Sequence, residues 1–276
     1  MNARSSAGRE SPECPYASQV RARSFARDWL PFIALLIAYN MLRGLAGRFF
    51  GVHYMPQIDF DKLVFFGQNG TVFLQRHLWN GTVTWYDVAC WGVYMTHFIA
   101  APLLAAVLWL TNRERFRRFV MAILVVSFAS VVTYALFPAA PPWMASQQGL
   151  IGPVTRILPH VASTFGMDST GSLISLGYRY ANNVAAVPSL HAAYSLLIAI
   201  AIWPHQRRWL RPVVALYPLA MAFTLIYTGE HYLFDVLLGW AYTGTSVFVL
   251  NRVYLRREMQ VLAGQTTAER GDALLA

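Results

Sequence analysis

The stretch of the chain that most suggests chemistry is YTGEHYLFD, residues 227–235, which places His231 and Asp235 four positions apart. On a helix this spacing puts both side chains on one face. The carboxylate can then accept a hydrogen bond from one imidazole nitrogen, which fixes the tautomer and makes the other nitrogen a better base or nucleophile. A second histidine, His191, follows Pro-Ser-Leu at the start of another apolar run. Two histidines and one aspartate suffice for phosphoryl transfer through a phosphohistidine.

These three residues divide the steps of such a transfer between them. We expect His231 to attack phosphorus, while Asp235 orients the ring and stabilises its charge. His191 protonates the departing oxygen and then acts as the base for the incoming alcohol or water. The free N–H groups of a helix start also suit a phosphate. A lone histidine at a helix end is more often structural than catalytic, but Asp235 lies inside an apolar run, where an ionisable side chain is a functional candidate by default.

The composition indicates an integral membrane protein. Of the 276 residues, 56% are hydrophobic and 13% are charged, whereas soluble domains carry about 25% charged residues. Several apolar runs reach the roughly 17–25 residues that span a bilayer. We therefore predict an all-α, polytopic fold, a bundle of six transmembrane helices with long extracytoplasmic loops. The predicted spans are residues 29–47, 87–110, 117–137, 189–203, 212–228 and 232–250.

The predicted domain organisation is simple. One membrane domain occupies residues 29–258, after a disordered cytoplasmic tail, 1–28, and before a cytoplasmic C-terminal tail, 259–276. The polar, Arg-bearing composition of the first segment is typical of disorder. We expect no second, soluble domain.

Arg-rich segments set the predicted orientation. NRERFRR (112–118), PHQRRWLR (204–211) and NRVYLRRE (251–258) adjoin the apolar runs, as cytoplasmic loops do. Because successive spans cross the membrane in opposite directions, the PSLH and YTGEH stretches then lie at one outer face, together with PAAPPWM (138–144). We expect a multi-pass protein of a bacterial cytoplasmic membrane with its site facing outward, since the excess of arginine over lysine suggests a GC-rich coding sequence.

Other residues carry less specific signals. The net charge of +9 lies next to the spans and not on a separate basic stripe, so we expect no nucleic-acid partner. Cys14 and Cys90 form neither a disulfide framework nor a metal motif. His97 lies near the middle of a span, where an interhelical hydrogen bond is the expected role. Gly229 and Gly239 are expected in a turn and at a close helix contact, respectively.

Three motifs resemble those of a known family. VPSLHAAYS (187–195) and YTGEHYLFDVLLGW (227–240) are similar to the second and third signatures of the type 2 phosphatidic acid phosphatase superfamily. That resemblance implies a six-helix membrane core with His231 as nucleophile, Asp235 as its partner and His191 as the acid. LFPAAPPWMA (136–145) resembles the first motif of one branch, the fungal inositol-phosphorylceramide synthases and their bacterial relatives. The resemblance covers about residues 115–250.

The chain departs from the phosphatase branch of this family in its cations. That branch has a Lys and an Arg-Pro pair in its first motif and Ser-Arg before the third-motif histidine, whereas here PAAPPWM has no cation and Thr224-Leu225 occupies the later position. Arg156 and Arg179 are candidate replacements; the alternative is that both are solvated loop charges. The residues expected to bind substrate are Ser189, Pro142, Trp143, Tyr227, Arg156 and Arg179.

We therefore predict a lipid phosphotransferase or phosphatase that needs no metal or cofactor. The donor is a phospholipid or lipid-linked phosphate, and the acceptor is a lipid alcohol, such as a ceramide or diacylglycerol, or water. A site with fewer cations suits a singly charged phosphodiester better than a doubly charged monoester, which favours headgroup transfer over dephosphorylation. The branch resemblance implies an inositolphosphotransferase. A simple lipid-phosphate or polyprenyl (pyro)phosphate phosphatase is the alternative.

Alternatives from other classes are a transporter with a His/Asp proton relay, a catalytically silent binding protein, and a metal enzyme. The metal enzyme would use His191, His231, Asp235 and Glu230.

Overall fold

The computed structural model describes residues 15–44, 47–167 and 182–275, with side chains described from residue 24 to residue 256 within these ranges. Arg179, one of the predicted substrate-binding residues, lies outside the described residues. The described chain is helical, with isolated bridges at His53–Ala139 and Ala139–Ala185 and no strand. The long apolar helices are α1 (Pro15–Arg43), α4 (Trp85–Thr111), α5 (Arg113–Leu136), α9 (Leu190–Ile202), α10 (Arg211–Tyr227) and α11 (Leu233–Leu275). The predicted all-α fold class is confirmed.

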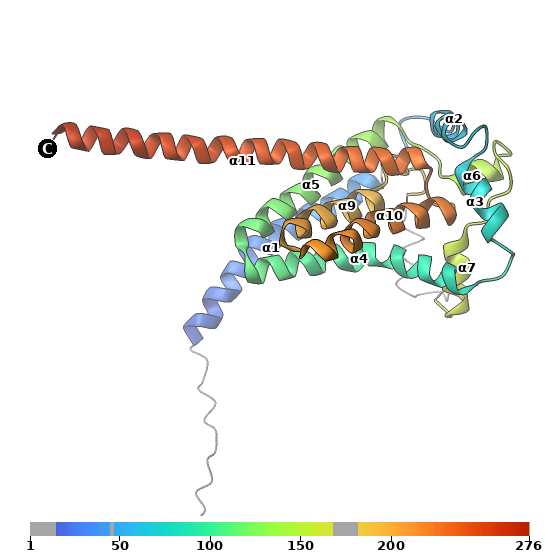
Figure 1. Ribbon diagram of the computed structural model, residues 1–276, viewed down its shortest axis with the longest axis horizontal. Coiled ribbons are helices and arrows are strands. Elements are labelled where there is room, and N and C mark those ends of the chain that lie inside the picture. The colour runs from blue at the N-terminus through green and yellow to red at the C-terminus, as the bar shows by residue number, and fades with distance from the viewer. Residues whose placement is uncertain (1–14, 45–46, 168–181, 276) are drawn as a thin grey trace, which may run out of the picture. The chain divides into compact units, whose positions relative to one another are not determined.

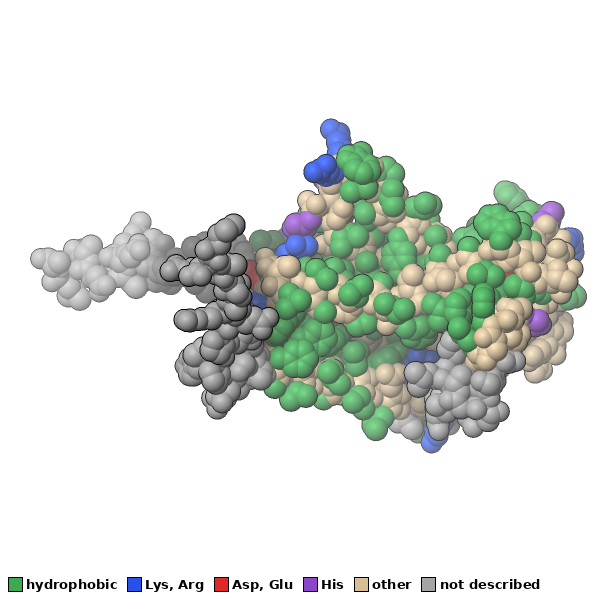
Figure 2. All heavy atoms as spheres, turned by 90° about the horizontal axis from the view of Figure 1, so that it is seen from below, with side chains coloured by type: hydrophobic (Ala, Val, Ile, Leu, Met, Phe, Trp, Pro, Cys, Tyr) green, Lys and Arg blue, Asp and Glu red, His purple; other side chains and the backbone are tan. Residues whose placement is uncertain are grey.

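Five helical segments are long and apolar enough to cross a membrane: Ser24–Arg43, Trp85–Thr111, Arg113–Leu136, Arg208–Tyr227 and Leu233–Arg256. Their outer faces carry large exposed hydrophobic side chains, and Figure 2 shows hydrophobic side chains gathered over the middle of the face that it draws. Helix α9 corresponds to the remaining predicted span. Its 13 residues are about 20 Å long, short of a roughly 30 Å hydrocarbon core. The multi-pass membrane class is confirmed, and the count of six spans stays a prediction.

The N-terminal end of the chain is more helical than expected. The chain divides into two compact units, Met1–Ala38 and Tyr39–Ala276. The first was expected to be disordered up to residue 28, but α1 begins at Pro15, so that expectation is wrong from Pro15 onward. The segment from Pro15 contains Ala, Gln and Arg, which favour helix, and proline suits a first helical position. At the other end α11 continues to Leu275.

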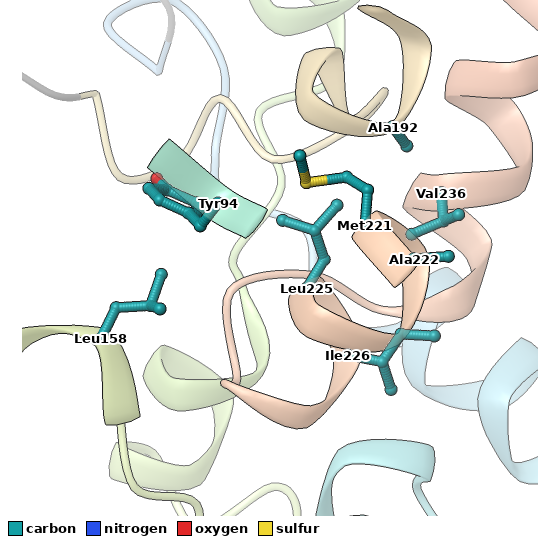
Figure 3. Close-up of a cluster of buried hydrophobic side chains, with 8 residues drawn as sticks. All are labelled: Tyr94, Leu158, Ala192, Met221, Ala222, Leu225, Ile226 and Val236. Atoms are coloured by element: carbon teal, nitrogen blue, oxygen red, sulfur yellow. The ribbon is translucent and has the colours of Figure 1, made fainter. Parts of the chain in front are cut away.

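Helix α9 is the central element of the second unit. It contacts α4, α5, α10 and α11, and Figure 1 shows these helices side by side. Between them lies a cluster of buried hydrophobic side chains, drawn in Figure 3, to which α7 also contributes. The members of this cluster are Tyr94, Leu158, Ala192, Met221, Ala222, Leu225, Ile226 and Val236. Because α9 is enclosed by neighbours, the position of its first turn is determined by their packing.

Side-chain hydrogen bonds link the helices in addition to this packing. They pair Ser127 with Tyr194 at 2.6 Å, Thr133 with Tyr242 at 2.6 Å, and Thr96 with Tyr217 at 2.8 Å. Such bonds between membrane helices contribute about 0.6 kcal/mol each, and up to 2. They connect α5 to α9, α5 to α11 and α4 to α10.

Four short helices gather at one end of the bundle, as Figure 1 shows. They are α2 (Met55–Val64), α3 (Gly70–Leu78), α6 (Pro142–Gln147) and α7 (Ile157–Thr164). The chain leaves α5 and enters α9 at this end, so the first turn of α9 lies beneath them. The single turns η1 (Trp203–His205) and η2 (Arg208–Leu210) connect α9 to α10 at the other end.

Helices α9 and α11 meet at their N-terminal turns. The Ser189 side chain caps α9 by accepting from the Ala192 N–H, and the Ser189 N–H donates to the Asp235 carbonyl at 3.0 Å. Gly239 permits this approach, because a Cβ built there would lie 2.4 Å from the Ser189 carbonyl oxygen. The predicted close-packing role of Gly239 is confirmed.

Gly239→Ala is expected to lower the stability of the protein, because a methyl group at this position collides with backbone that cannot move aside. Overpacking of this kind costs about 1–3 kcal/mol. The measurement is the apparent melting temperature in detergent. Gly244→Ala is the matched control, because it lies in the same helix with nothing within 4 Å of its added Cβ. Equal melting temperatures for the two variants would contradict the prediction.

Candidate active site

The turn between α10 and α11 holds His231 beside Asp235. Gly229 takes φ +83°, a left-handed conformation that confirms its predicted turn role. The chain then folds back, and the His231 N–H donates to the Leu225 carbonyl at 3.1 Å. The His231 Nδ1 atom lies 3.2 Å from Asp235 Oδ2. The structure therefore forms the pair that the four-residue spacing suggested.

The geometry of this pair differs from the expected one, in which both residues lie on the same helix. His231 precedes α11, so the two residues are not on one continuous helix face. Asp235 instead lies in the first turn and accepts the Tyr232 N–H at 3.0 Å, as an acidic residue at this position of a helix often does. One carboxylate oxygen thus holds both the helix start and the imidazole. Among the described residues nothing bonds His231 Nε2, which is left available to a substrate.

His191 lies next to this pair. It belongs to the first turn of α9, and its ring centroid is 6.0 Å from that of His231. Tyr94 of α4 stacks on the His191 ring at 4.4 Å, which fixes its orientation. Two histidines and one aspartate that are far apart in the sequence are therefore brought together, as the predicted chemistry requires.

His97 is a further histidine at this place. Its ring centroid lies 4.0 Å from that of His191 and 5.1 Å from the ring of Tyr194. The interhelical hydrogen bond expected for it is not formed, because its buried Nδ1 has no partner in the described part of the chain. Sequence reasoning missed its proximity to His191, since nothing in the pattern of α4 indicates which neighbour it faces.

The Pro-rich motif supplies one edge of the site. The Trp143 N–H, in α6, lies 3.4 Å from the Gly229 carbonyl. Arg156 passes over the Trp143 ring at 4.9 Å and pairs with both oxygens of Glu230, at 2.8 and 3.0 Å. Glu230 adjoins His231 in the chain. Arg156 is therefore part of an ion pair beside the site, and its binding of substrate stays a prediction.

The other expected substrate-binding residues are engaged with protein. Ser189 is fully buried as the cap of α9, and Pro142 is buried as the first residue of α6. The Tyr227 hydroxyl donates to Asp87 of α4 at 2.7 Å. The tyrosine is fully buried next to Cys90 and is not open to a ligand. The structure gives these three side chains positioning contacts.

Asp61 of α2 supports the site from behind, and sequence reasoning did not find it. Its Oδ1 accepts the Leu233 N–H at the start of α11 at 3.1 Å. Its Oδ2 accepts the Gly70 N–H and lies 3.3 Å from the Asn69 side-chain nitrogen. Burial raises the pKa of Asp61 to about 7, and the charge of Asp235 adds to this effect, while the amide donors oppose it. The carboxyl thus joins α2, α3 and α11.

Gln75 of α3 makes a second connection of this kind. Its side chain donates to the carbonyls of Thr155 and Tyr227, both at 2.8 Å, and accepts the Thr155 N–H at 2.8 Å. These bonds hold the residue before Arg156 against the end of α10. The position of the Arg156–Glu230 pair therefore depends on α3.

The donor side chains of the described residues do not form a metal site. Within the described ranges no group of three or more His, Cys, Asp or Glu side chains is arranged to hold an ion. Glu230, the fourth ligand of the metal-enzyme alternative, is bound to Arg156. The arrangement instead offers an oriented imidazole, a neighbouring imidazole and a buried carboxylate, which suit nucleophilic and acid–base chemistry.

A helical membrane bundle with a His–Asp pair and a second histidine at one end defines a class of protein, and comparison places the chain within it. The sequence model of the PAP2 superfamily matches residues 66–249. The chain therefore belongs to the PAP2 superfamily, and the resemblance of its motifs is confirmed.

Two known proteins are similar to this chain. The phosphoinositol dihydroceramide synthase of Bacteroides thetaiotaomicron is 34% identical over 156 residues, which are 54% of this chain and 50% of that protein. The chain thus matches about half the length of this curated relative. The crystal structure of Aquifex aeolicus LpxE is similar with a TM-score of 0.49 and 16% identity, covering 66% of this chain and 94% of that one.

The pKa of Asp61 predicts a pH dependence of stability. In the folded protein the Asp61 carboxyl stays protonated up to about pH 7, whereas its ordinary pKa is 3.8. The folded state therefore gains stability from binding this proton, and that gain is lost as the pH rises from 3.8 to about 7. The melting temperature of the wild type minus that of Asp61→Asn is expected to fall between pH 5 and pH 8. Asp59→Asn, an exposed change in the same helix, is the control. A difference that does not vary with pH would contradict this assignment.

Proposed function

We propose that this protein is a membrane lipid phosphotransferase that works through a phosphohistidine. The observation that carries the proposal is the His231 ring, whose Nδ1 is held by Asp235 while Nε2 is left unbonded by the described residues. A second histidine, with its ring centroid 6.0 Å away, supplies the acid. Membership of the PAP2 superfamily supports the same chemistry.

The reaction has two displacement steps. In the first, the Nε2 lone pair of His231 attacks phosphorus, the bond to the leaving alcohol breaks, and the alcohol oxygen takes a proton from His191. In the second, neutral His191 removes the proton of the acceptor hydroxyl, whose oxygen attacks phosphorus as the N–P bond breaks. Asp235 stabilises the positive charge of His231 while the phosphoryl group is attached. Both histidines return to their starting protonation states.

The donor we favour is a phospholipid with a singly charged phosphodiester. Arg156, expected as a phosphate-binding cation, is already neutralised by Glu230, so fewer free cations remain for a doubly charged monoester. The relative from Bacteroides thetaiotaomicron is named as a phosphoinositol dihydroceramide synthase. We therefore propose inositol-phosphate-type headgroup transfer to a lipid alcohol, with hydrolysis as the alternative when water is the acceptor.

We further propose that the site faces outward from a bacterial cytoplasmic membrane. Arg113, Arg115, Arg117 and Arg118 lie in the first turns of α5, whose other end leads into the Pro-rich motif. Arg207, Arg208 and Arg211 lie beyond the far end of α9, away from His191. These clusters are therefore at the end of the bundle opposite the site, where the positive-inside rule places the cytoplasm.

The test is an assay of purified protein with labelled phospholipids and lipid phosphates, with and without ceramide or diacylglycerol. We expect new phospholipid as the product, and His231→Ala should lower the turnover by at least about 1,000-fold, because the nucleophile is lost. His77→Ala, an exposed histidine outside the site, is the matched control.

The products separate the competing functions. Free phosphate alone, lost in His231→Ala, would identify a phosphatase. Turnover that survives His231→Ala would contradict the phosphohistidine. No product from any lipid would move the assignment to the transporter or silent-binder alternatives.

The Arg156–Glu230 pair yields a separate prediction. Arg156→Ala leaves the Glu230 carboxylate, whose side chain is 8% exposed, uncompensated beside His231. Breaking such a pair by removing one partner costs about 3–5 kcal/mol, so stability and turnover should both fall. The double variant Arg156→Ala, Glu230→Gln should recover much of the loss. If the double variant is as inactive as the single one, Arg156 acts on the substrate and not through Glu230.

A further inference from the structure

Arg43, the last residue of α1, belongs to the same compact unit as the site. Tyr39, one helical turn earlier, is buried in a cluster with Val126, Leu190 and Ala193. The spacing of four residues puts Arg43 on the same helix face as Tyr39. The Asn182 side chain donates to the Arg43 carbonyl at 2.9 Å, which ties the helix end to the segment leading into α9. The end of α1 is therefore held against the start of α9.

The end of α1 brings Arg43 close to the histidines of the site, since Tyr39 packs against Leu190, which directly precedes His191. The charge of Arg43 acts on the rings of His97 and His191. It also interacts with the hydroxyls of Tyr39, Tyr94 and Tyr134. Tyr94 is the ring stacked on His191, and the Tyr134 hydroxyl donates to the Pro188 carbonyl at 2.7 Å, directly before Ser189. All these groups enclose the first turn of α9.

Arg43 differs from Arg156 in its counter-ion. Arg156 has Glu230, whereas no Asp or Glu among the described residues pairs with Arg43. Arg43 is nevertheless partly buried, unlike the exposed Arg48 shortly after it. A cation withdrawn from water without an anion is costly. The site thus contains a positive charge that a bound anion would compensate.

We propose that Arg43 binds the phosphate of the substrate beside His191. A guanidinium matches two phosphate oxygens through parallel N–H···O bonds, and one such cation balances a single negative charge. The inference rests on the proposed function and names the cation that replaces those missing from the first and third motifs. Residue 43 lies before the segment 66–249 that the family model matches. The last turn of α1, which belongs to the same compact unit as the site, is thereby part of the proposed binding site.

Arg43 also acts during the reaction. Charge on the nonbridging oxygens must be stabilised while His231 attacks, and a positioned cation does so without reorganisation. Arg43 approaches from α1, on the side of His191, while His231 approaches from the α10–α11 turn. The phosphate is then held from two helices before either bond changes.

The experiment compares Arg43→Ala, Arg43→Lys and the control Arg48→Ala. In the phospholipid assay, Arg43→Ala should lower kcat/KM by about 10- to 100-fold, the effect of losing a hydrogen bond to a charged group. Arg43→Lys should keep part of the activity because it keeps the charge, and added guanidinium ion should partly restore Arg43→Ala. Arg48→Ala should match the wild type.

A second measurement does not depend on turnover. Inorganic phosphate should raise the melting temperature of the wild type and of Arg48→Ala, because a ligand that binds only the folded state stabilises it. It should not raise that of Arg43→Ala. The inference is overturned if phosphate protects Arg43→Ala as well as it protects the wild type. It is also overturned if added guanidinium ion restores no activity and Arg43→Ala loses activity only because it unfolds.

The two proposals fail in different ways. If no lipid is turned over but phosphate protection still requires Arg43, the anion site stands, free phosphate is its ligand, and the enzymatic proposal falls. If lipid is turned over equally by the wild type and Arg43→Ala, the enzymatic proposal stands and the role of Arg43 falls.

Discussion

The contact between the first turns of α9 and α11 is the constraint on which the site depends. The Ser189 N–H donates to the Asp235 carbonyl, and Gly239 allows the two backbones to approach within a distance that any side chain would prevent. Because His191 follows Ser189 closely and His231 precedes Asp235, this one contact determines the separation of the two imidazoles. The bundle around α9 and the short helices above it serve to hold that contact in place.

Electrostatic compensation shapes the surroundings of this contact. Asp235 is fully buried, and one of its oxygens serves both His231 and the start of α11. Asp61 caps the same helix start from α2 with a carboxyl whose pKa lies near neutrality. Glu230, between the turn and His231, is balanced by Arg156. Most of the charges around this contact are therefore compensated by other groups of the protein.

The location of the site at one end of an apolar bundle fits a lipid substrate. Hydrophobic side chains are exposed along the long helices, so the acyl chains of a lipid can stay in the bilayer while its headgroup reaches the histidines. The short helices α2, α3, α6 and α7 lie at that end and are tied to it by Asp61 and Gln75. The backbone N–H groups of Leu233, Gly70 and Thr155 are thus paired with buried side chains of α2 and α3, and an unpaired group in an apolar environment would cost several kcal/mol.

The sequence by itself determined the membrane class, the positions of the long apolar helices and the pairing of His231 with Asp235, because hydropathy and spacing are local properties. It also placed His191 at a helix start. Only the tertiary structure decided which distant groups surround them: Asp61 bonds an N–H 172 positions away, and Arg156 pairs with Glu230 at a separation of 74. The proximity of His97 and Arg43 to His191 was equally invisible. Burial and charge compensation depend on the packing of separate helices, and periodicity carries no information about which helix lies next to which.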